Sequence, residues 1–542
     1  MERNRVAGSL TALSAAALLF VSACDRPPRD ADRPAGPRLV VLLVIDQMRA
    51  DRLLESSPPP GSGRARLLVD GRIYENAHHA HAYTWTAAGH ASMVSGVHPS
   101  RHGIIGNSWW ERPERRRVRA AVDPGTRLVD LPEKTGRSGF RLRVSTLGDW
   151  LKEQSPASQV WAVSIKDRAA AIVAGKTADG AFWYDFDRGR FVTSDYYMEQ
   201  EPAWAVAFDE SRTVEAYRDG WDLLDDPGSY ERPDDAPGEP QASTFPHPFS
   251  DGDAYYPQIY NTPFGDQFTF EFVAALIEGQ QLGKDAASDL LIVSASTSDQ
   301  IGHIYGPWSR EIEDYDRRLD NFLNALFDQL DAAVGVGRWL VALTSDHGVV
   351  PVPEQTPGAA RIPFGALAAS TQARLDEGLE ALGLDPGSVR LDYVNGVVLD
   401  ANPEVPAEAL ADLRTRLAAR LTEHPRIEDV FTWDELASET PLGRPYEPEF
   451  RRSFDPSRSA DLMVRFREFD LISSGTSGAN HGSVYTYDTH VPLVFLGAGV
   501  TAGRVDTPVW TVDLAPTLAG CLGIEPPAGL DGEIRLECSP AP

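Results

Sequence analysis

The sequence predicts an α/β fold, in which helices cover both faces of a mostly parallel central sheet. Five short apolar runs have the character of strands that are buried on both faces; they are residues 39–45, 160–165, 290–295, 339–344 and 491–496. Between the runs lie helical patterns, of which residues 311–330 are the clearest because their apolar side chains recur along one face. Strands that alternate with amphipathic helices are typical of a parallel sheet, since each parallel connection needs a crossover.

Two segments interrupt this alternation, and we expect both to be insertions in one domain of residues 38–540. Residues of about 205–262 are acidic and rich in proline, glycine and aromatic side chains, which favours a loop-rich insertion. Residues of about 355–455 combine a hairpin, with Asn395-Gly396 as its turn, and an amphipathic helix near residues 406–421. This second insertion is predicted to form a small α+β cap. We also expect the protein to be a monomer.

The charge of the chain restricts its partners. The 542 residues contain 51 Lys and Arg against 79 Asp and Glu, which gives a formal charge of −28. A broad nucleic-acid-binding surface needs a basic face, so we expect no nucleic-acid polymer as a partner. A small anion held in a local positive pocket remains compatible with this composition.

The first 23 residues have the charged start, apolar run and small final residues of a signal peptide. Val21-Ser22-Ala23-Cys24 resembles the lipobox of bacterial lipoproteins, in which the cysteine becomes the lipidated N-terminus. We therefore expect a periplasmic protein that Cys24 anchors to a membrane through a flexible tether, residues 24–37. In such lipoproteins an aspartate at the position of Asp25 often favours the inner membrane. The alternative is a simple signal whose cleavage leaves a soluble protein.

The chain has three cysteines, so Cys521 and Cys538 remain if Cys24 carries lipid. In an oxidising compartment these two residues form a disulfide candidate. Two free buried thiols are the alternative.

Acidic and imidazole side chains lie next to several of the predicted strands, where functional groups collect in open α/β sheets. Each one alone is also explained as a helix cap or a chance neighbour. Together these six side chains form a set of ligands that suits zinc. Six ligands exceed one tetrahedral site and fall short of two, so a seventh group is needed. The residues are Asp46 after the first run, Asp299 and His303 after the third, Asp346 and His347 after the fourth, and His481 before the fifth.

The segment Thr84-Trp85-Thr86 precedes a helix-compatible stretch and supplies a candidate for the missing ligand. The free amides at a helix N-terminus favour phosphate and an alkoxide. A threonine hydroxyl on a metal becomes a nucleophile, and paired metals support in-line phosphoryl transfer. The ordinary alternative is a threonine N-cap, and the spacing does not choose between Thr84 and Thr86.

In their order and sequence context, the candidate residues resemble the alkaline phosphatase superfamily, most closely its bacterial phosphate monoesterases with a threonine nucleophile. The resemblance implies an alkaline phosphatase-like fold and two Zn²⁺ ions. One is held by Asp299, His303 and His481, and the other by Asp46, Asp346, His347 and Thr86. It also makes Thr86 the nucleophile, which forms a phosphothreonine intermediate. The motifs that carry the resemblance are Asp46, Thr86 in TAAGH, Asn107 in HGIIGN, Lys166-Asp167-Arg168, Asp299 with His303, Asp346-His347-Gly348 and His481-Gly482.

Lys166 and Arg168 distinguish monoesters from diesters, because two cations favour the extra charge of a monoester dianion. In the resembling family this pair marks the monoesterases, and Asn107 donates a neutral hydrogen bond to another phosphoryl oxygen. We therefore expect small phosphate monoesters as substrates. The alternatives are a phosphodiesterase or nucleotide pyrophosphatase on the same metals, and a non-catalytic phosphate-binding lipoprotein. A sulfatase is disfavoured because no Cys or Ser occupies the nucleophile position.

Overall fold

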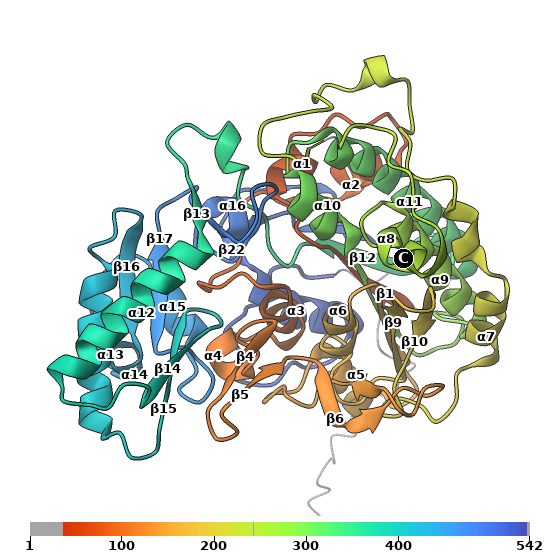
Figure 1. Cartoon of the computed structure of the whole chain (residues 1–542). Coiled ribbons are helices and arrows are strands. Elements are labelled where there is room, and N and C mark those ends of the chain that lie inside the picture. The colour runs from red at the N-terminus through yellow and green to blue at the C-terminus, as the bar shows by residue number, and fades with distance from the viewer. Residues whose placement is uncertain (1–35, 242, 539–542) are drawn as a thin grey trace, which may run out of the picture. The chain divides into compact units, whose positions relative to one another are not determined.

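A nine-stranded sheet forms the centre of the computed structural model, which describes residues 36–241 and 243–538 (Figure 1). Its strands are β1 (Leu39–Ile45), β2 (Arg72–Tyr74), β8 (Val160–Ser164), β9 (Gly180–Asp185), β10 (Arg190–Val192), β11 (Asp289–Ala295), β12 (Trp339–Thr344), β20 (Val494–Gly497) and β21 (Gly503–Val505). They lie in the order β10-β9-β8-β11-β1-β12-β20-β2-β21. The five strands from β9 to β12 in this order are parallel, whereas β10 and β20 run antiparallel to their neighbours. The predicted α/β class and mostly parallel sheet are confirmed.

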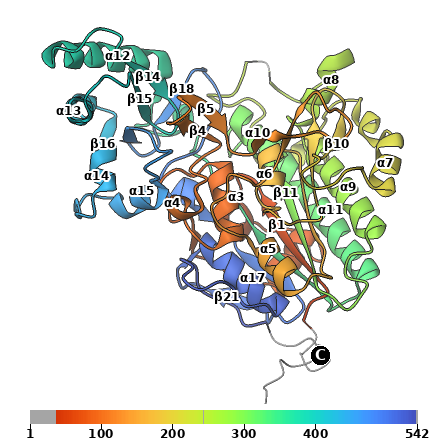
Figure 2. The ribbon, with the colours of Figure 1, turned by 90° about the horizontal axis from the view of Figure 1, so that it is seen from below.

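Both faces of the sheet are buried, as the continuous apolar runs predict. In β1, Leu39, Val41, Leu43 and Ile45 join one hydrophobic cluster, and the alternating valines and leucine join another. The first cluster includes side chains of α2 (Gly63–Asp70), α9 (Phe264–Gly279) and α11 (Arg310–Ala333). The second includes side chains of α3 (Thr86–Ser95), α5 (Leu147–Gln154) and α17 (Leu514–Leu522). Figure 2 shows α9 and α11 on one side of β1 and β11, with α3 on the other.

One predicted strand is wrong in its extent. The run 491–496 forms the end of a two-residue strand, β19 (His490–Val491), and most of β20. Pro492 separates them because it has no amide hydrogen to donate to a neighbouring strand. The two strands then pair in different sheets, and β20 is antiparallel to β12.

Three strands of the segment predicted as the second insertion form a four-stranded antiparallel sheet with β17 (Leu462–Phe466). The strands lie in the order β14 (Val389–Tyr393), β15 (Val397–Ala401), β17 and β16 (Ile427–Thr432). Helices α12 (Phe364–Ala381) and α13 (Ala407–Leu421) supply apolar side chains to the core of this cap. Asn395 and Gly396 lie in the turn between β14 and β15 with φ of 52° and 123°, a region that asparagine and glycine tolerate best. Strand β17 comes from beyond residue 455.

The first insertion contains short elements that pack against the main domain. They are α7 (Ala203–Glu210), η2 (Thr213–Tyr217), η3 (Pro227–Ser229), η4 (Gly252–Ala254) and α8 (Tyr255–Ile259). Trp221 is fully buried, and its indole N–H donates to Asp314 Oδ2 at 2.7 Å, which fixes the insertion to α11.

Shorter elements complete the described chain. The strands are β3 (Ala77–His78), β4 (Ser108–Glu111), β5 (Arg116–Arg119), β6 (Val122–Arg127), β7 (Thr135–Arg137), β13 (Arg361–Pro363), β18 (Leu471–Ser473) and β22 (Val509–Trp510). The helices are α1 (Ala50–Leu54), α4 (Pro99–His102), α6 (Asp167–Ala171), α10 (Thr297–Tyr305), η5 (Pro353–Gln355), α14 (Trp433–Ala437), α15 (Glu447–Ser453), α16 (Thr486–Thr489) and η6 (Thr511–Asp513).

The structure joins Cys521 and Cys538 by a disulfide with an S–S distance of 1.95 Å. The predicted signal peptide and the lipidation candidate Cys24 lie outside the described residues. Within residues 36–241 and 243–538, no helix combines the length and the apolar character that crossing a membrane requires.

Candidate active site

The predicted site residues meet at the carboxyl edge of the parallel sheet. Asp46 follows β1 directly, Lys166 follows β8, and Asp346 follows β12. Asp299 lies in the first turn of α10, just beyond β11. Because β8, β11, β1 and β12 are neighbours in the sheet, these four side chains approach one another although they are far apart in sequence.

One group of ligand-type side chains consists of Asp299, His303 and His481. Asp299 Oδ1 lies 3.1 Å from His303 Nε2 and 3.5 Å from His481 Nε2. Asp299 and His303 are four residues apart on α10, so the helix places both side chains on one face. The three ligand atoms lie within 4.8 Å of one another, close enough to hold one metal ion.

The second group surrounds His347, whose Nε2 lies 3.3 Å from Asp346 Oδ2 and 3.5 Å from Asp46 Oδ1. These two carboxylate oxygens are buried without a hydrogen-bond partner among the described residues. Such orphaned oxygens are costly unless a cation satisfies them. Asp299 also lies within 4.8 Å of Asp46 and His347, so the two groups are adjacent.

All three histidines are held in the orientation that a metal ligand needs. Each donates its Nδ1–H to a backbone carbonyl, which orients the ring and turns Nε2 toward the aspartates. Burial lowers the pKa of His481 well below its usual value, so its imidazole stays neutral, the form that binds metal. The acceptors are the carbonyl oxygens of Ala479 for His303 at 3.0 Å, Gly348 for His347 at 2.9 Å and Thr84 for His481 at 2.7 Å.

The charged groups that lie close together in the site shift the pKa values of its aspartates. Burial and the neighbouring charge of Asp346 raise the pKa of Asp46 to about 7. Burial also acts to raise the pKa of Asp299, but His303 and Lys166 outweigh it and hold this pKa well below its usual range. Carboxylates and imidazoles that converge in this way fit divalent metal ions in both groups.

Thr86 is the first residue of α3, and its hydroxyl lies 3.4 Å from His347 Nε2. The helix end comes this close because Gly89 has no side chain; a Cβ there would lie 2.2 Å from the carbonyl oxygen of Asp346. Thr84 instead donates its hydroxyl to the carbonyl of Ser483 at 3.0 Å. The structure therefore brings Thr86, rather than Thr84, beside the ligand groups.

Of the three predicted phosphate-binding residues, Asn107 and Lys166 contact elements of the site, and Arg168 lines a cavity together with Lys166. Asn107 accepts the amide hydrogen of Ala87 at 2.9 Å through Oδ1, which fixes its side chain beside Thr86 at the start of α3. Lys166 Nζ lies 2.7 Å from Asp46 Oδ2 and 2.5 Å from Asp299 Oδ2, so it connects the two ligand groups. Within the described part of the chain, Arg168 Nε is buried without a partner. Lys166 and Arg168 both line a cavity of about 700 Å³.

Gln47 is a residue that the sequence patterns did not single out. It is fully buried, its backbone adopts a φ of 66°, and its Nε2 donates to Asp299 Oδ1 at 2.7 Å. Its backbone N–H donates to Asp346 Oδ1 at 3.2 Å. Gln47 thus contacts both ligand groups, and its only signal in the sequence is its place directly after Asp46.

Asp488 was also missed. Its Oδ2 accepts hydrogen bonds from the Gly482 amide at 3.0 Å and from the amide and hydroxyl of Ser483 at 2.7 and 2.6 Å. This carboxylate therefore holds the loop that carries His481.

Comparison with known proteins gives a consistent relationship. The family model of type I phosphodiesterases and nucleotide pyrophosphatases matches residues 40–484. Alkaline phosphatase PhoV of Synechococcus elongatus is 32% identical over 521 residues, which cover 92% of this chain and 92% of that protein. Alkaline phosphatase PafA of Elizabethkingia meningoseptica is 31% identical over 520 residues, which cover 92% of this chain and 93% of that protein.

Solved structures show the same relationship. The crystal structure of wild-type PafA has a TM-score of 0.85 at 30% identity and covers 93% of this chain and 99% of that one. Another structure is of a PafA variant that is changed at a threonine, an asparagine, a lysine and an arginine. Its threonine and asparagine have the sequence spacing of Thr86 and Asn107, and its lysine and arginine that of Lys166 and Arg168.

Murine ectonucleotide pyrophosphatase/phosphodiesterase 5 shares the fold at a TM-score of 0.52 and 15% identity, over 91% of this chain and 97% of that one. The match to the family model and the similarity to the two alkaline phosphatases extend over most of the described chain. The chain therefore belongs to the type I phosphodiesterase and nucleotide pyrophosphatase family, within the alkaline phosphatase superfamily.

Proposed function

We propose that this protein is an alkaline phosphatase, a metal-dependent hydrolase of phosphate monoesters that acts through a phosphothreonine on Thr86. The observation that carries the proposal is the position of the Thr86 hydroxyl, at the start of a helix and 3.4 Å from the ligand atom of His347. Relatives that are about 30% identical over most of the chain and are named alkaline phosphatases support it.

The reaction consists of two displacements at phosphorus. In the first, Thr86 Oγ1 gives up its proton and forms a bond to phosphorus, and the bond from phosphorus to the alcohol oxygen breaks. The departing alkoxide takes a proton and leaves as the alcohol. In the second, water attacks the phosphothreonine, the bond to Thr86 breaks, and the threonine hydroxyl is restored with release of inorganic phosphate. The N-terminal end of α3 stabilises negative charge beside the nucleophile, because the peptide dipoles of the helix point their positive ends there.

Two zinc ions would complete the site, one in each ligand group. Asp299, His303 and His481 would hold the first, and Asp46, Asp346, His347 and Thr86 the second. When bound, such ions supply Lewis-acid stabilisation of the attacking and departing oxygens. The zinc assignment follows from the mixture of carboxylate and imidazole ligands, which is typical of zinc sites.

Lys166, Arg168 and Asn107 would bind the oxygens of the phosphoryl group. Lys166 lies between the two ligand groups, and Arg168 keeps a buried, unpaired Nε within the described chain. Asn107 uses Oδ1 to accept from Ala87, which leaves its amide hydrogens as donors. Two cations and one neutral donor match the dianionic charge of a monoester better than the single charge of a diester.

The description of the matching family supports a second candidate, a phosphodiesterase or nucleotide pyrophosphatase on the same residues. A non-catalytic phosphate-binding protein is disfavoured, since binding alone does not need a threonine hydroxyl beside the ligand groups.

The test compares an aryl phosphate monoester with an aryl phosphate diester in wild type and in Lys166→Ala with Arg168→Ala. We expect the double variant to lose about 100-fold or more in kcat/KM toward the monoester, and at most about tenfold toward the diester. Lys284→Ala with Arg416→Ala removes the same charge from exposed positions and is expected to leave both rates unchanged. Equal losses toward both esters, or a wild type that prefers the diester, would overturn the monoesterase proposal.

We further propose that the protein acts as a monomer in the periplasm, anchored by lipid on Cys24, with a soluble form as the alternative. The lipobox-like sequence supports this location, as does a disulfide of the kind that persists in oxidising compartments. Palmitate labelling of the wild type that is absent from Cys24→Ser is the expected result, and equal labelling of both would contradict it.

A further inference from the structure

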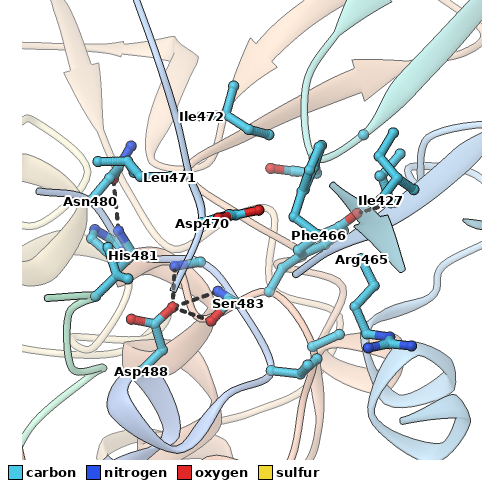
Figure 3. Close-up of a pocket in the computed structure, with 18 of the residues that line it drawn as sticks. Ile427, Arg465, Phe466, Asp470, Leu471, Ile472, Asn480, His481, Ser483 and Asp488 are labelled. Atoms are coloured by element: carbon cyan, nitrogen blue, oxygen red, sulfur yellow. Dashed lines mark hydrogen bonds between the residues drawn. The ribbon is translucent and has the colours of Figure 1, made fainter. Parts of the chain in front are cut away.

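An additional cavity of about 330 Å³ lies where the cap meets the loop that carries His481. Figure 3 shows His481 and Asp488 on one side of it and Ile427, Phe466 and Arg465 on the other. Its size falls within the range of sites for small organic ligands, roughly 300–1,000 Å³.

The lining of this cavity is suited to an uncharged group. Aromatic and aliphatic side chains predominate in it, and several of them, such as Phe364, Leu367 and Tyr393, come from the cap. Its charged residues balance, with Arg465 and Arg467 against Asp470 and Asp488. The two aspartates accept hydrogen bonds from nearby backbone amides, and each keeps one buried oxygen without a partner in the described chain. The carboxylates of these two residues in the lining disfavour a second phosphate there.

A row of aromatic rings connects the cavity with the proposed active site. The Trp85 ring, which lines the cavity beside the nucleophile Thr86, is centred 5.2 Å from the His481 ring. The His481 ring stacks on that of His347 at 3.4 Å. By contrast, the larger cavity beside Lys166 and Arg168 is lined by many charged residues: Arg119, Lys134 and Arg137 are cationic, and Asp167, Asp185 and Asp187 are acidic. Lys134 and Arg137 pair with these aspartates. The cavity beside the phosphate-binding candidates is therefore highly charged, whereas the cavity beside the cap is mostly apolar.

We propose that the apolar cavity binds the organic group of the substrate, so that the enzyme prefers phosphate monoesters of apolar, especially aromatic, alcohols. The proposal rests on the proposed function and adds a substrate class to it. The occupant is assigned from continuity: His481 belongs both to a ligand group and to the wall of the cavity, and Trp85 directly precedes Thr86.

The experiment measures kcat/KM for 1-naphthyl phosphate and methyl phosphate in wild type and in Leu367→Trp. Leu367 is a partly buried cavity residue on the cap, far in sequence from the reacting groups, and tryptophan there would fill space. We expect the variant to lose about tenfold or more toward the naphthyl ester and less than about twofold toward the methyl ester. Inhibition by inorganic phosphate is expected to be unchanged. Ala373→Trp, on an exposed position of the same helix α12, is the matched control and is expected to change neither rate.

A direct binding measurement keeps the result independent of turnover. Wild type is expected to bind 1-naphthylphosphonate at least about tenfold more tightly than methylphosphonate, and Leu367→Trp to lose this difference. Leu367→Ala serves if the tryptophan variant does not fold, and it is expected to weaken binding of the naphthyl compound alone. Equal effects on the naphthyl and methyl compounds, or none, would overturn the cavity assignment. A change in oligomeric state with unchanged kinetics would assign the cavity to a second copy and also overturn it. If wild type hydrolyses neither ester, the proposed function fails instead.

Discussion

At the scale of single residues, the site depends on side chains whose orientation the backbone fixes. His303, His347 and His481 each donate Nδ1–H to a carbonyl oxygen, and so each presents Nε2 to the ligand groups. The unpartnered oxygens of Asp46 and Asp346 face the same region. A preformed arrangement of this kind reduces the reorganisation that metal binding would otherwise require.

Gln47 provides a prediction at this scale, because one amide group contacts Asp299 while its backbone contacts Asp346. Gln47→Gly keeps the positive φ without strain but removes the donor to Asp299. We expect metal affinity to fall about 10- to 100-fold, measured by competition with a chelator of known affinity. Gln47→Glu places a carboxylate where the amide donated, and we expect an equal or larger loss.

Gln372→Glu on an exposed turn of α12 makes the same chemical change away from the site and is expected to keep the wild-type metal affinity. If Gln47→Gly retains full affinity for both metals, the positioning role assigned to this residue is wrong.

The types and places of the candidate residues could be predicted from the sequence, because strand ends and short motifs are local signals. Whether Thr84 or Thr86 faces the ligands could not be predicted from spacing, because the answer depends on a contact with His347, 261 residues away. Gln47 was missed for the same reason, since its partner Asp299 lies 252 residues further along the chain.

At the scale of elements, the loop that carries His481 is held by a residue of the next helix. Asp488 in α16 accepts three hydrogen bonds from Gly482 and Ser483, and Gly482 adopts a φ of 112° that glycine tolerates. Burial raises the pKa of Asp488 from 3.8 to about 7.

The raised pKa of Asp488 predicts how the stability of the metal-free protein depends on pH. Between about pH 4 and pH 7 the folded state keeps the proton of Asp488 while the unfolded state releases it, so stability falls as the pH rises. Asp488→Asn cannot ionise, and we expect the wild type to lose on the order of 1–4 kcal/mol relative to this variant between pH 5 and pH 8. Urea unfolding at the two pH values measures the difference.

Asp376→Asn on an exposed position of α12 is the control and is expected to follow the wild type at both pH values. Parallel pH profiles of wild type and Asp488→Asn would show that the carboxyl group does not titrate in this window.

The strands and the helix whose apolar residues follow one regular pattern were predicted well. Residues 39–45 and 339–344 form β1 and β12 with the expected bounds, and the predicted helix 311–330 lies within α11. Residues 491–496 were wrong because the apolar run signals burial but does not reveal that Pro492 divides it between two sheets.

At the scale of the whole molecule, the fold brings together ligands from residue 46 to residue 481. The acidic ligands come together because they follow neighbouring parallel strands, whose carboxyl ends lie at one edge of the sheet. The sequence did not predict that the cap recruits β17, since an antiparallel pairing between distant segments leaves no local pattern. Nor did it predict the cavity beside the cap, which forms only when separate segments of the chain meet.

The fold shows where part of the chain-wide charge of −28 is concentrated. Asp46, Asp299 and Asp346 account for part of the acidic excess, and they concentrate negative charge where divalent cations would bind. Lys166 and Arg168 then give the same position the local positive charge that a phosphate dianion needs.

The central claim is that Thr86 forms a phosphothreonine, and the most direct test is acid-quench trapping with a ³²P-labelled aryl phosphate. Wild type, Thr86→Ala and Thr84→Ala are compared, and turnover and metal content are measured for each. We predict labelled phosphothreonine at residue 86 in wild type. In Thr86→Ala the label disappears and turnover falls about 1,000-fold or more, while metal content stays largely intact. In the described structure the Thr84 hydroxyl donates its hydrogen bond to the Ser483 carbonyl. Thr84→Ala is therefore expected to keep the label and most of the activity. Full turnover by Thr86→Ala, or label on another residue, would contradict the account.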